Sequence, residues 1–299
     1  MPSTFDPTTP SAPLKTQRRA LAGFVLLALA LAAGNSHGGG ADLQTDLDAS
    51  KPALAASPFG RELTVNSSDT GSQASGEARS IVDRPFPEVA RGLGAPEQWC
   101  EALILPFNVK GCQTRPGFLS LWIGRKTDQP IEQAQKLDFA FRPAEREAAY
   151  FETSLIAALG PMGTRDYRIS VKAAPAGSGK TYLLMSYSYS YGFAAKLGLD
   201  AYLASAGRSK IGFTQEAGRP IGGARGAIER NAMRYFLALE AHLASVSEPP
   251  GAPRDAAAAK LWFDATERHP AQLREMDFAS YSTMKREEAR RMREGLVKN

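Results

Sequence analysis

The sequence predicts an α+β fold in which a curved antiparallel sheet wraps around a long C-terminal helix. Two observations support this. Runs with a period of two, typical of half-buried strands, follow one another from about residue 104 to residue 191, with turn residues between them. A single long helical pattern then occupies residues 226–246. Because the strands precede the helix and do not alternate with it, we expect an antiparallel sheet with the helix on one face.

The clearest strands flank a turn at residues 174–182 (APAGSGKTY). Tyr167, Ile169 and Val171 alternate with polar residues before it, and residues 183–191 alternate after it. The turn ends like a Walker A loop, but position 174 is Ala where that motif has Gly. A phosphate-binding loop is followed by a helix, whereas the pattern after this turn predicts a strand. We therefore predict the tip of a β-hairpin and no nucleotide site.

The helix at 226–246 has one apolar stripe, and the sequence Glu248–Pro253 (EPPGAP) ends it. This spacing predicts one buried face. The stripe consists of Ile228, Ala232, Tyr235, Phe236, Leu239, Leu243 and Val246. Other strands are predicted at 78–82, 104–112, 118–125, 137–142, 150–159 and 209–216, and short helices at 86–93, 95–102 and 194–206.

The N-terminus has the pattern of a secretory signal peptide. Residues 15–19 are basic, residues 20–33 are uncharged and rich in Leu and Ala, and small residues follow. The apolar run is shorter than the ~20 residues that a bilayer span needs. We expect export to the periplasm with cleavage after residue 33 or residue 41. The alternative is an uncleaved segment that anchors the protein in the inner membrane.

Composition divides the remaining chain into three parts. Residues 42–75 contain few large apolar side chains and are predicted to be a flexible linker. Residues 76–247 contain the predicted sheet and long helix. Residues 248–299 are predicted to be a polar helical tail whose docking side chains are Leu261, Trp262, Phe263, Leu273 and Met276.

Cys100 and Cys112 are the only cysteines. In an exported protein, a closely spaced pair favours a disulfide, and the alternative is two buried free thiols. The three histidines, His37, His242 and His269, are not part of a zinc motif. We expect no metal and no cofactor.

Charge and motifs narrow the function further. The chain has 36 basic and 31 acidic residues, a net charge of +5, and no aromatic residues along a basic stripe. Mixed signs are typical of solvated helix faces, so we expect no nucleic-acid partner. There is no nucleophile elbow, and no pair of carboxylates can be placed face to face, so we assign no catalytic residue.

Three stretches resemble the START-like superfamily, which includes polyketide cyclase/dehydrase and lipid-transfer domains. Residues 76–89 resemble its first strand and the turn into the first helix. Trp99 resembles the aromatic residue of the second short helix, and residues 225–234 resemble the opening of the closing helix. The resemblance covers residues 76–247, and it is to uncharacterised exported proteobacterial members more than to any enzyme. It implies a helix-grip fold with a cavity that binds a lipid or another hydrophobic molecule.

The strand at 183–191 would line that cavity if its larger side chains point inward. Its phenol rings would then give an apolar pocket some hydroxyl groups. The alternatives are ordinary cross-strand packing and the outer face of the sheet. The predicted lining is Leu183, Met185, Tyr187, Tyr189 and Tyr191 on the strand, opposite Phe236, Leu239 and Leu243 on the helix.

These expectations describe a non-catalytic protein of the cell envelope that binds or transfers a lipid or another hydrophobic small molecule. Contact with a membrane is expected only through an uncleaved signal sequence or transient lipid exchange. One alternative is a cyclase/dehydrase-like or hydrolytic enzyme that uses Tyr and Glu groups of the cavity, such as Glu152. The other is a structural partner in envelope assembly.

Overall fold

The computed structural model describes residues 38–193, 196–198, 201, 205 and 210–295. The predicted basic and apolar parts of the signal peptide lie outside these residues, as does most of the helix predicted at 194–206. The largest sheet of the described residues has eight strands, in the order β1-β2-β8-β7-β6-β5-β4-β3, and each neighbouring pair is antiparallel. Its strands are β1 (Leu63–Asp69), β2 (Gln73–Val82), β3 (Val109–Arg115), β4 (Phe118–Ile123), β5 (Gln135–Glu147), β6 (Tyr150–Leu159), β7 (Thr164–Pro175) and β8 (Thr181–Tyr191).

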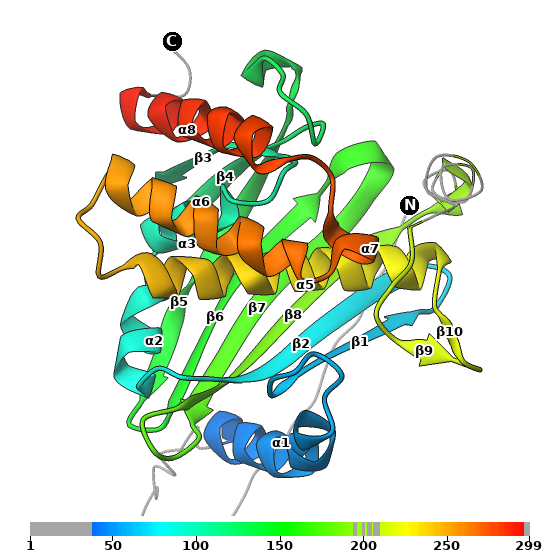
Figure 1. Cartoon of the computed structure of the whole chain (residues 1–299), viewed down its shortest axis with the longest axis vertical. Helices are drawn as coiled ribbons and strands as arrows, with labels where there is room; N and C mark the ends of the chain where they lie inside the picture. Colours follow the sequence, from blue (N-terminus) through cyan, green and yellow to red (C-terminus); the bar gives the residue numbers. More distant parts are fainter. Residues whose placement is uncertain (1–37, 194–195, 199–200, 202–204, 206–209, 296–299) are drawn as a thin grey trace, which may run out of the picture. The chain divides into compact units, whose positions relative to one another are not determined.

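The long helix α5 (Gly223–Ser245) lies across one face of this sheet, as Figure 1 shows. It contacts β1, β2 and β8, and its apolar stripe shares one core with the inward side chains of the strands. The short helices α2 (Phe86–Gly92) and α3 (Pro96–Leu103) connect β2 to β3. An antiparallel sheet that closes on a long helix, with two short helices in this connection, is a helix-grip fold. The predicted fold class is therefore confirmed.

Strand β8 places its larger side chains on the side of the sheet that faces α5. Leu183, Met185, Tyr187, Tyr189 and Tyr191 all belong to the main core with α5. Tyr182 lies on the opposite face in a separate apolar cluster. The outer-face alternative for the tyrosine strand is therefore wrong.

The hairpin predicted at residues 174–182 is confirmed, because its turn joins β7 to β8 directly. The amide of Ala176 donates to the carbonyl of Lys180 at 3.0 Å, and the amide of Lys180 donates to the carbonyl of Gly177 at 2.9 Å. Gly177 and Gly179 both have positive φ, a conformation that glycine adopts without steric cost. These two glycines therefore allow the backbone to form the turn.

The prediction of a flexible linker at residues 42–75 is wrong. This stretch contains β1 and most of helix α1 (Gly38–Ala55), which packs on the outer face of the sheet. Leu43, Leu47 and Leu54 are buried there. A Cβ atom at Gly39 would come within 2.7 Å of the Tyr150 ring, so glycine permits the close approach. Three leucines on one helical face provide the burial that composition alone did not reveal.

Two predicted strands also differ from the structure. In the stretch 104–112, residues before Val109 form turns and only the end belongs to β3. In the stretch 209–216, the described part contributes only the short β9 (Gln215–Glu216), which pairs with β10 (Arg219–Pro220). Both stretches alternate in polarity, but they lack a partner strand along most of their length.

The tail after residue 247 is helical, as predicted, and it packs into the main core. It forms α6 (Ala252–Glu267), α7 (Pro270–Leu273) and α8 (Phe278–Glu294), and α6 runs beside α5. Trp262 is fully buried, and its indole nitrogen donates to the carbonyl of Arg234 at 3.0 Å. Leu273 is also fully buried, whereas Leu261 stays exposed.

A buried ionic cluster fixes α8 to the loop before β3. We call Lys110, Lys285 and Glu288 the Glu288 cluster; all three are buried. Glu288 Oε1 lies 3.1 Å from Lys110 Nζ, and Glu288 Oε2 lies 2.7 Å from Lys285 Nζ. Lys110 also donates to the carbonyl of Phe107, and Lys285 to those of Pro106 and Val109. Lys110 has a third partner in Met284 Sδ at 3.3 Å, so each ammonium group has a protein partner for all three of its donors.

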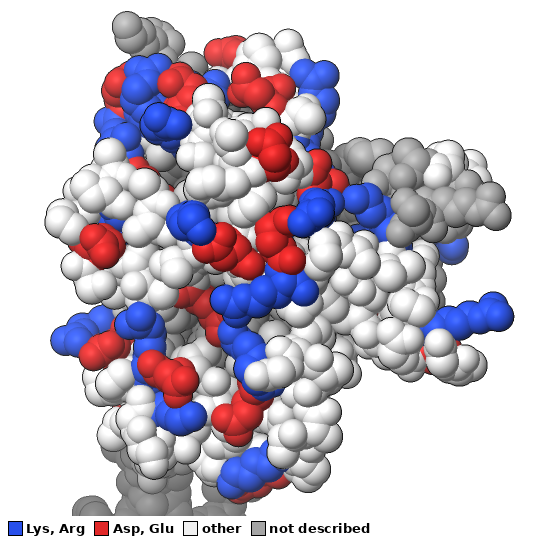
Figure 2. All heavy atoms as spheres, viewed as in Figure 1, with Lys and Arg blue, Asp and Glu red and all other residues white. Residues whose placement is uncertain are grey.

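The face viewed in Figure 2 carries positive and negative side chains interspersed, without a broad field of one sign. Several charged side chains of the described residues are paired along a helix, such as Lys260 with Asp264 and Arg290 with Glu287. None of the helices in the described ranges combines the length and the apolar character that crossing a membrane requires.

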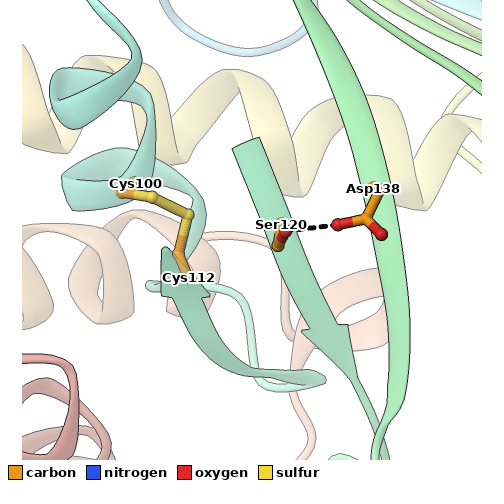
Figure 3. The surroundings of a disulfide bond; sticks show 4 residues. All are labelled: Cys100, Cys112, Ser120 and Asp138. Carbon is orange, nitrogen blue, oxygen red and sulfur yellow. Dashed lines mark hydrogen bonds between the residues drawn. A yellow bond between two sulfur atoms is a disulfide. The ribbon is translucent and has the colours of Figure 1, made fainter. Parts of the chain in front are cut away.

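The predicted disulfide is present between Cys100 and Cys112, and it joins α3 to the edge strand β3 (Figure 3). The two Cα atoms are 5.3 Å apart, and both cysteines are buried. On the neighbouring strands, the hydroxyl of Ser120 donates to Asp138, which links β4 to β5. The disulfide therefore fixes a helix to the edge of the sheet.

Candidate ligand-binding cavity

A cavity of about 160 Å³ remains between the inner face of the sheet and the N-terminal half of α5. Pairs of side chains two positions apart line it from β4, β5 and β7, because alternate residues of a strand share a face. Tyr187 of β8 and two residues of α5 complete the wall. The lining residues are Asn108, Leu121, Ile123, Leu137, Phe139, Pro161, Tyr167, Ile169, Tyr187, Asn231 and Tyr235.

Three tyrosines give this mostly apolar cavity its hydroxyl groups. Tyr187 and Tyr235 meet edge to face, with ring centroids 5.2 Å apart. The Tyr167 ring lies 6.2 Å from that of Tyr187, and its hydroxyl lies 2.9 Å from that of Thr164. Tyr189 stacks on the Tyr167 ring at 5.2 Å. The phenols form a connected network from β7 across β8 to α5.

Burial keeps these phenols neutral. It raises the pKa of Tyr187 well above its usual value, raises that of Tyr189 to about 12, and also raises the pKa values of Tyr167 and Tyr235. Neutral phenols donate and accept hydrogen bonds, so they can orient a polar group of a ligand. They do not serve as bases near pH 7.

The eight predicted lining residues occupy three different places. Tyr187 borders the cavity, and Leu243 borders a separate groove between α5 and α6. The other six lie in the core, where they contact other side chains: Leu183, Met185, Tyr189, Tyr191, Phe236 and Leu239. The predicted strand and helix therefore do face one another, but the space between them lies nearer to β4, β5 and β7.

Some residues that line the cavity were not predicted, because their sequence patterns indicate burial but not a position at a cavity. Tyr235 was recognised as part of the apolar stripe of the long helix, and Tyr167 and Ile169 as an alternating strand. Asn231 is polar and lies off the stripe, so nothing in the sequence marks it. Which inward side chains leave a space between them depends on how β4 and β5 pack opposite α5.

A groove of about 330 Å³ opens between the end of β2, α5 and α6. Glu240 is paired there with Arg61, which also donates to the hydroxyl of Ser80 at 3.1 Å. Burial raises the pKa of Glu240 although Arg61 opposes the shift. Asp83, Arg84 and Arg268 also line this groove, so its charged wall is less suited to an apolar ligand.

A smaller cavity of about 100 Å³ lies between α3, α5, α6 and α8 beside His242. Burial lowers the pKa of His242 to about 4, and its Nε2 lies 2.9 Å from the carbonyl of Gly92. The neutral imidazole therefore donates from Nε2, and its Nδ1 lies 3.5 Å from Glu101 Oε2. His242 holds α2 against α5. Within the described residues, no group of three or more His, Cys, Asp or Glu side chains is placed to bind a metal.

Comparison with known proteins finds similar structures but no sequence match: no family model and no curated protein matches. A norcoclaurine synthase from Thalictrum flavum superposes with a TM-score of 0.34 and 12% identity, over 47% of this chain and 90% of that one. Human StAR-related lipid transfer protein 5 gives 0.33 and 10%, over 71% and 100%. A conserved protein from Geobacillus kaustophilus gives 0.34 and 11%, over 57% and 95%. The helix-grip assignment rests on the element order and strand pairing described above.

Proposed function

We propose that this protein binds a small hydrophobic molecule in the cavity between the sheet and α5, without converting it. The observation that carries the proposal is a space of about 160 Å³ lined by aliphatic and aromatic side chains together with neutral hydroxyl and amide groups. Binding pockets typically combine apolar walls with a small number of polar groups that orient the ligand. The phenols of Tyr167, Tyr187 and Tyr235 have that role here.

The size of the cavity narrows the ligand class. An apolar protein cavity of roughly 150 Å³ accommodates benzene, whereas drug-sized ligands occupy roughly 300–1,000 Å³. The ligand is therefore a molecule with about one aromatic ring or a short aliphatic chain. A whole phospholipid or sterol would require α5 to move away from β4 and β5. Of the ligands that the sequence resemblance implies, the cavity favours the small hydrophobic molecule over the lipid.

The lining also favours binding over catalysis. General acid–base catalysis needs a group whose pKa lies near the working pH. The described lining side chains are Asn, Leu, Ile, Phe, Pro and Tyr, and burial raises the pKa values of the tyrosines. Glu152, the carboxylate considered for an enzyme, accepts a hydrogen bond from Tyr150 on the outer face of the sheet, beside α1.

We place this binding in the cell envelope. The basic, apolar and small residues at positions 15–41 support export, and the Cys100–Cys112 disulfide is typical of an oxidising compartment. Fractionation of cells that produce the full chain tests this part of the proposal. Recovery of the protein in the cytoplasm with both thiols reduced would contradict it.

Binding is tested with 4-fluorotoluene, followed by ¹⁹F NMR on the purified mature protein. The wild type is expected to show saturable binding. Asn231→Phe fills the cavity from a half-buried position of α5 and should abolish it. Arg168→Phe is the matched control, since Arg168 neighbours Ile169 on β7 but is exposed on the outer face. Absence of binding to the wild type, or equal binding to Asn231→Phe, would refute the proposal.

A further inference from the structure

Next to the cavity, three cations from separate elements surround one carboxylate. We call Lys126, Lys210, Arg234 and Glu275 the Glu275 cluster. Glu275 Oε1 lies 2.5 Å from Lys126 Nζ and 2.6 Å from an Arg234 nitrogen, and Oε2 lies 3.2 Å from Lys210 Nζ. Lys126 follows β4, Lys210 precedes β9, Arg234 belongs to α5, and Glu275 lies between α7 and α8. Four distant segments therefore meet at this point.

The cluster holds more positive charge than Glu275 neutralises. Counted over these four side chains alone, three cations and one carboxylate give an excess of two positive charges. Burial and then the charge of Arg234 lower the pKa of Lys126 to about 8, even though Glu275 acts in the opposite direction. The pKa of Glu275 is lowered although burial opposes the shift, because Lys126 donates a hydrogen bond to it and Arg234 adds its charge. The site thus favours a second negative charge.

Two of the cations have donors left for a ligand. An ammonium group has three N–H donors. Among the described residues, Glu275 is the one side chain that accepts from Lys126 and from Lys210. Their side chains are 35% and 24% exposed, so an anion can reach them. Arg230 fixes Lys210 in place by donating to its carbonyl and to that of Ile211, at 2.7 and 3.1 Å.

The cluster adjoins the cavity on two sides. Asn231 lines the cavity and lies three residues before Arg234 on α5, and residues three apart on a helix are neighbours on its surface. Ile123 also lines the cavity and ends β4, three residues before Lys126. The four residues of the Glu275 cluster do not line the cavity themselves, but two of them follow lining residues closely along α5 and after β4.

We propose that the ligand is an organic monocarboxylate whose apolar body occupies the cavity and whose carboxylate binds the ammonium groups of Lys126 and Lys210. This inference rests on the proposed binding function and specifies its ligand class. The carboxylate accepts hydrogen bonds from both lysines beside Glu275, so the net charge of the site falls from two to one. Neutral molecules of the same shape gain only the apolar contacts.

The test compares 4-fluorophenylacetate with its neutral isostere 4-fluorophenylacetamide by ¹⁹F NMR titration at pH 7 and low salt. The wild type should bind the acid about tenfold more tightly than the amide, a ratio that corresponds to ~1.4 kcal/mol. Lys126→Met combined with Lys210→Met should remove this preference and leave the affinity for the amide unchanged. Lys51→Met, which alters an exposed lysine on α1, should retain the preference.

The outcomes separate the two proposals. Equal affinities for acid and amide in the wild type would overturn the carboxylate inference while leaving the binding function intact. A preference that survives in the double variant would also overturn it, because the two lysines would then not be responsible. If neither molecule nor 4-fluorotoluene binds, the binding function itself fails and the inference fails with it. Raised salt should weaken only the binding of the acid, because the ammonium groups are partly exposed.

Discussion

Replacing Glu288 by Gln leaves two buried ammonium groups without a counter-charge, and we expect it to destabilise the protein strongly. The substitution keeps the size and shape of the side chain. Among the described residues, Glu288 is the one carboxylate in contact with Lys110 and Lys285, and none of the three side chains is more than 4% exposed. Removing one partner of a buried ion pair typically costs about 3–5 kcal/mol.

Urea unfolding at pH 7, followed by circular dichroism, measures this loss through the midpoint at unchanged slope. The control is the triple variant Lys110→Met, Lys285→Met, Glu288→Leu, which replaces the whole cluster with apolar side chains. Such replacements are often neutral or stabilising by about 1–4 kcal/mol. A loss below about 1 kcal/mol for Glu288→Gln would refute the reasoning, since it would mean that water solvates the cluster.

The loss of stability caused by Glu288→Gln should depend on pH. Burial lowers the pKa of Lys285 to about 8, below the ~10.4 of an unfolded lysine. Between these values the unfolded chain binds more protons than the folded one, so this group makes stability rise as the pH rises from 8 to 10. The cost of Glu288→Gln should therefore be smaller at pH 9.5 than at pH 7. An equal or larger cost at pH 9.5 would contradict the assignment.

Three further predictions follow from other parts of the structure. Replacing Cys100 and Cys112 by Ser should lower the free energy of unfolding by about 3 kcal/mol, because the disulfide closes a short loop, and an unchanged urea midpoint would contradict this. If the protein is exported with cleavage, as proposed, the cut should follow residue 33, because cleavage after residue 41 would remove the first turn of α1; intact-mass measurement of the mature protein distinguishes the two. Burial lowers the pKa of His242 to about 4, so this residue contributes about 3 kcal/mol to the free energy of unfolding, and this contribution is lost as the pH falls from 6.5 to 4. The variant His242→Gln should therefore lose less stability than the wild type over this pH range. An equal loss in the variant would show that His242 does not cause it.

Local pattern was sufficient for the parts of the fold whose partners are close in sequence. The β7–β8 hairpin is an example, because the alternation of Tyr167 and Ile169 and the glycines at 177 and 179 are all local signals. The stripe on α5 is another, since a period of 3.6 needs no knowledge of what covers it. The disulfide required only the compartment and the spacing of two cysteines.

The parts that were missed depend on distant partners. Leu43, Leu47 and Leu54 are too sparse to predict a helix in a polar stretch, and their burial needs Tyr150 and the outer face of the sheet. Trp262 was predicted to dock, but its complete burial arises because α6 runs beside α5, which no local pattern indicates. For the cavity, the sequence left several alternatives open, and the sheet face that meets the long helix was one of them. The sequence did not predict where packing between the sheet and the helix is incomplete, because that is a property of several strands together.

The contacts of α1 and α8 have a consequence for the order in which the chain assembles. Asp46 of α1 binds the hydroxyl of Tyr182, 136 residues later, and Lys285 of α8 binds the carbonyl of Val109, 176 residues earlier. Contacts so far apart in sequence form slowly, since a long loop must close first. The central hairpin is local and can pair soon after it is synthesised. Helices α1 and α8 therefore dock after this hairpin has formed, and α8 completes the core only once residues 110 and 285–288 are both available.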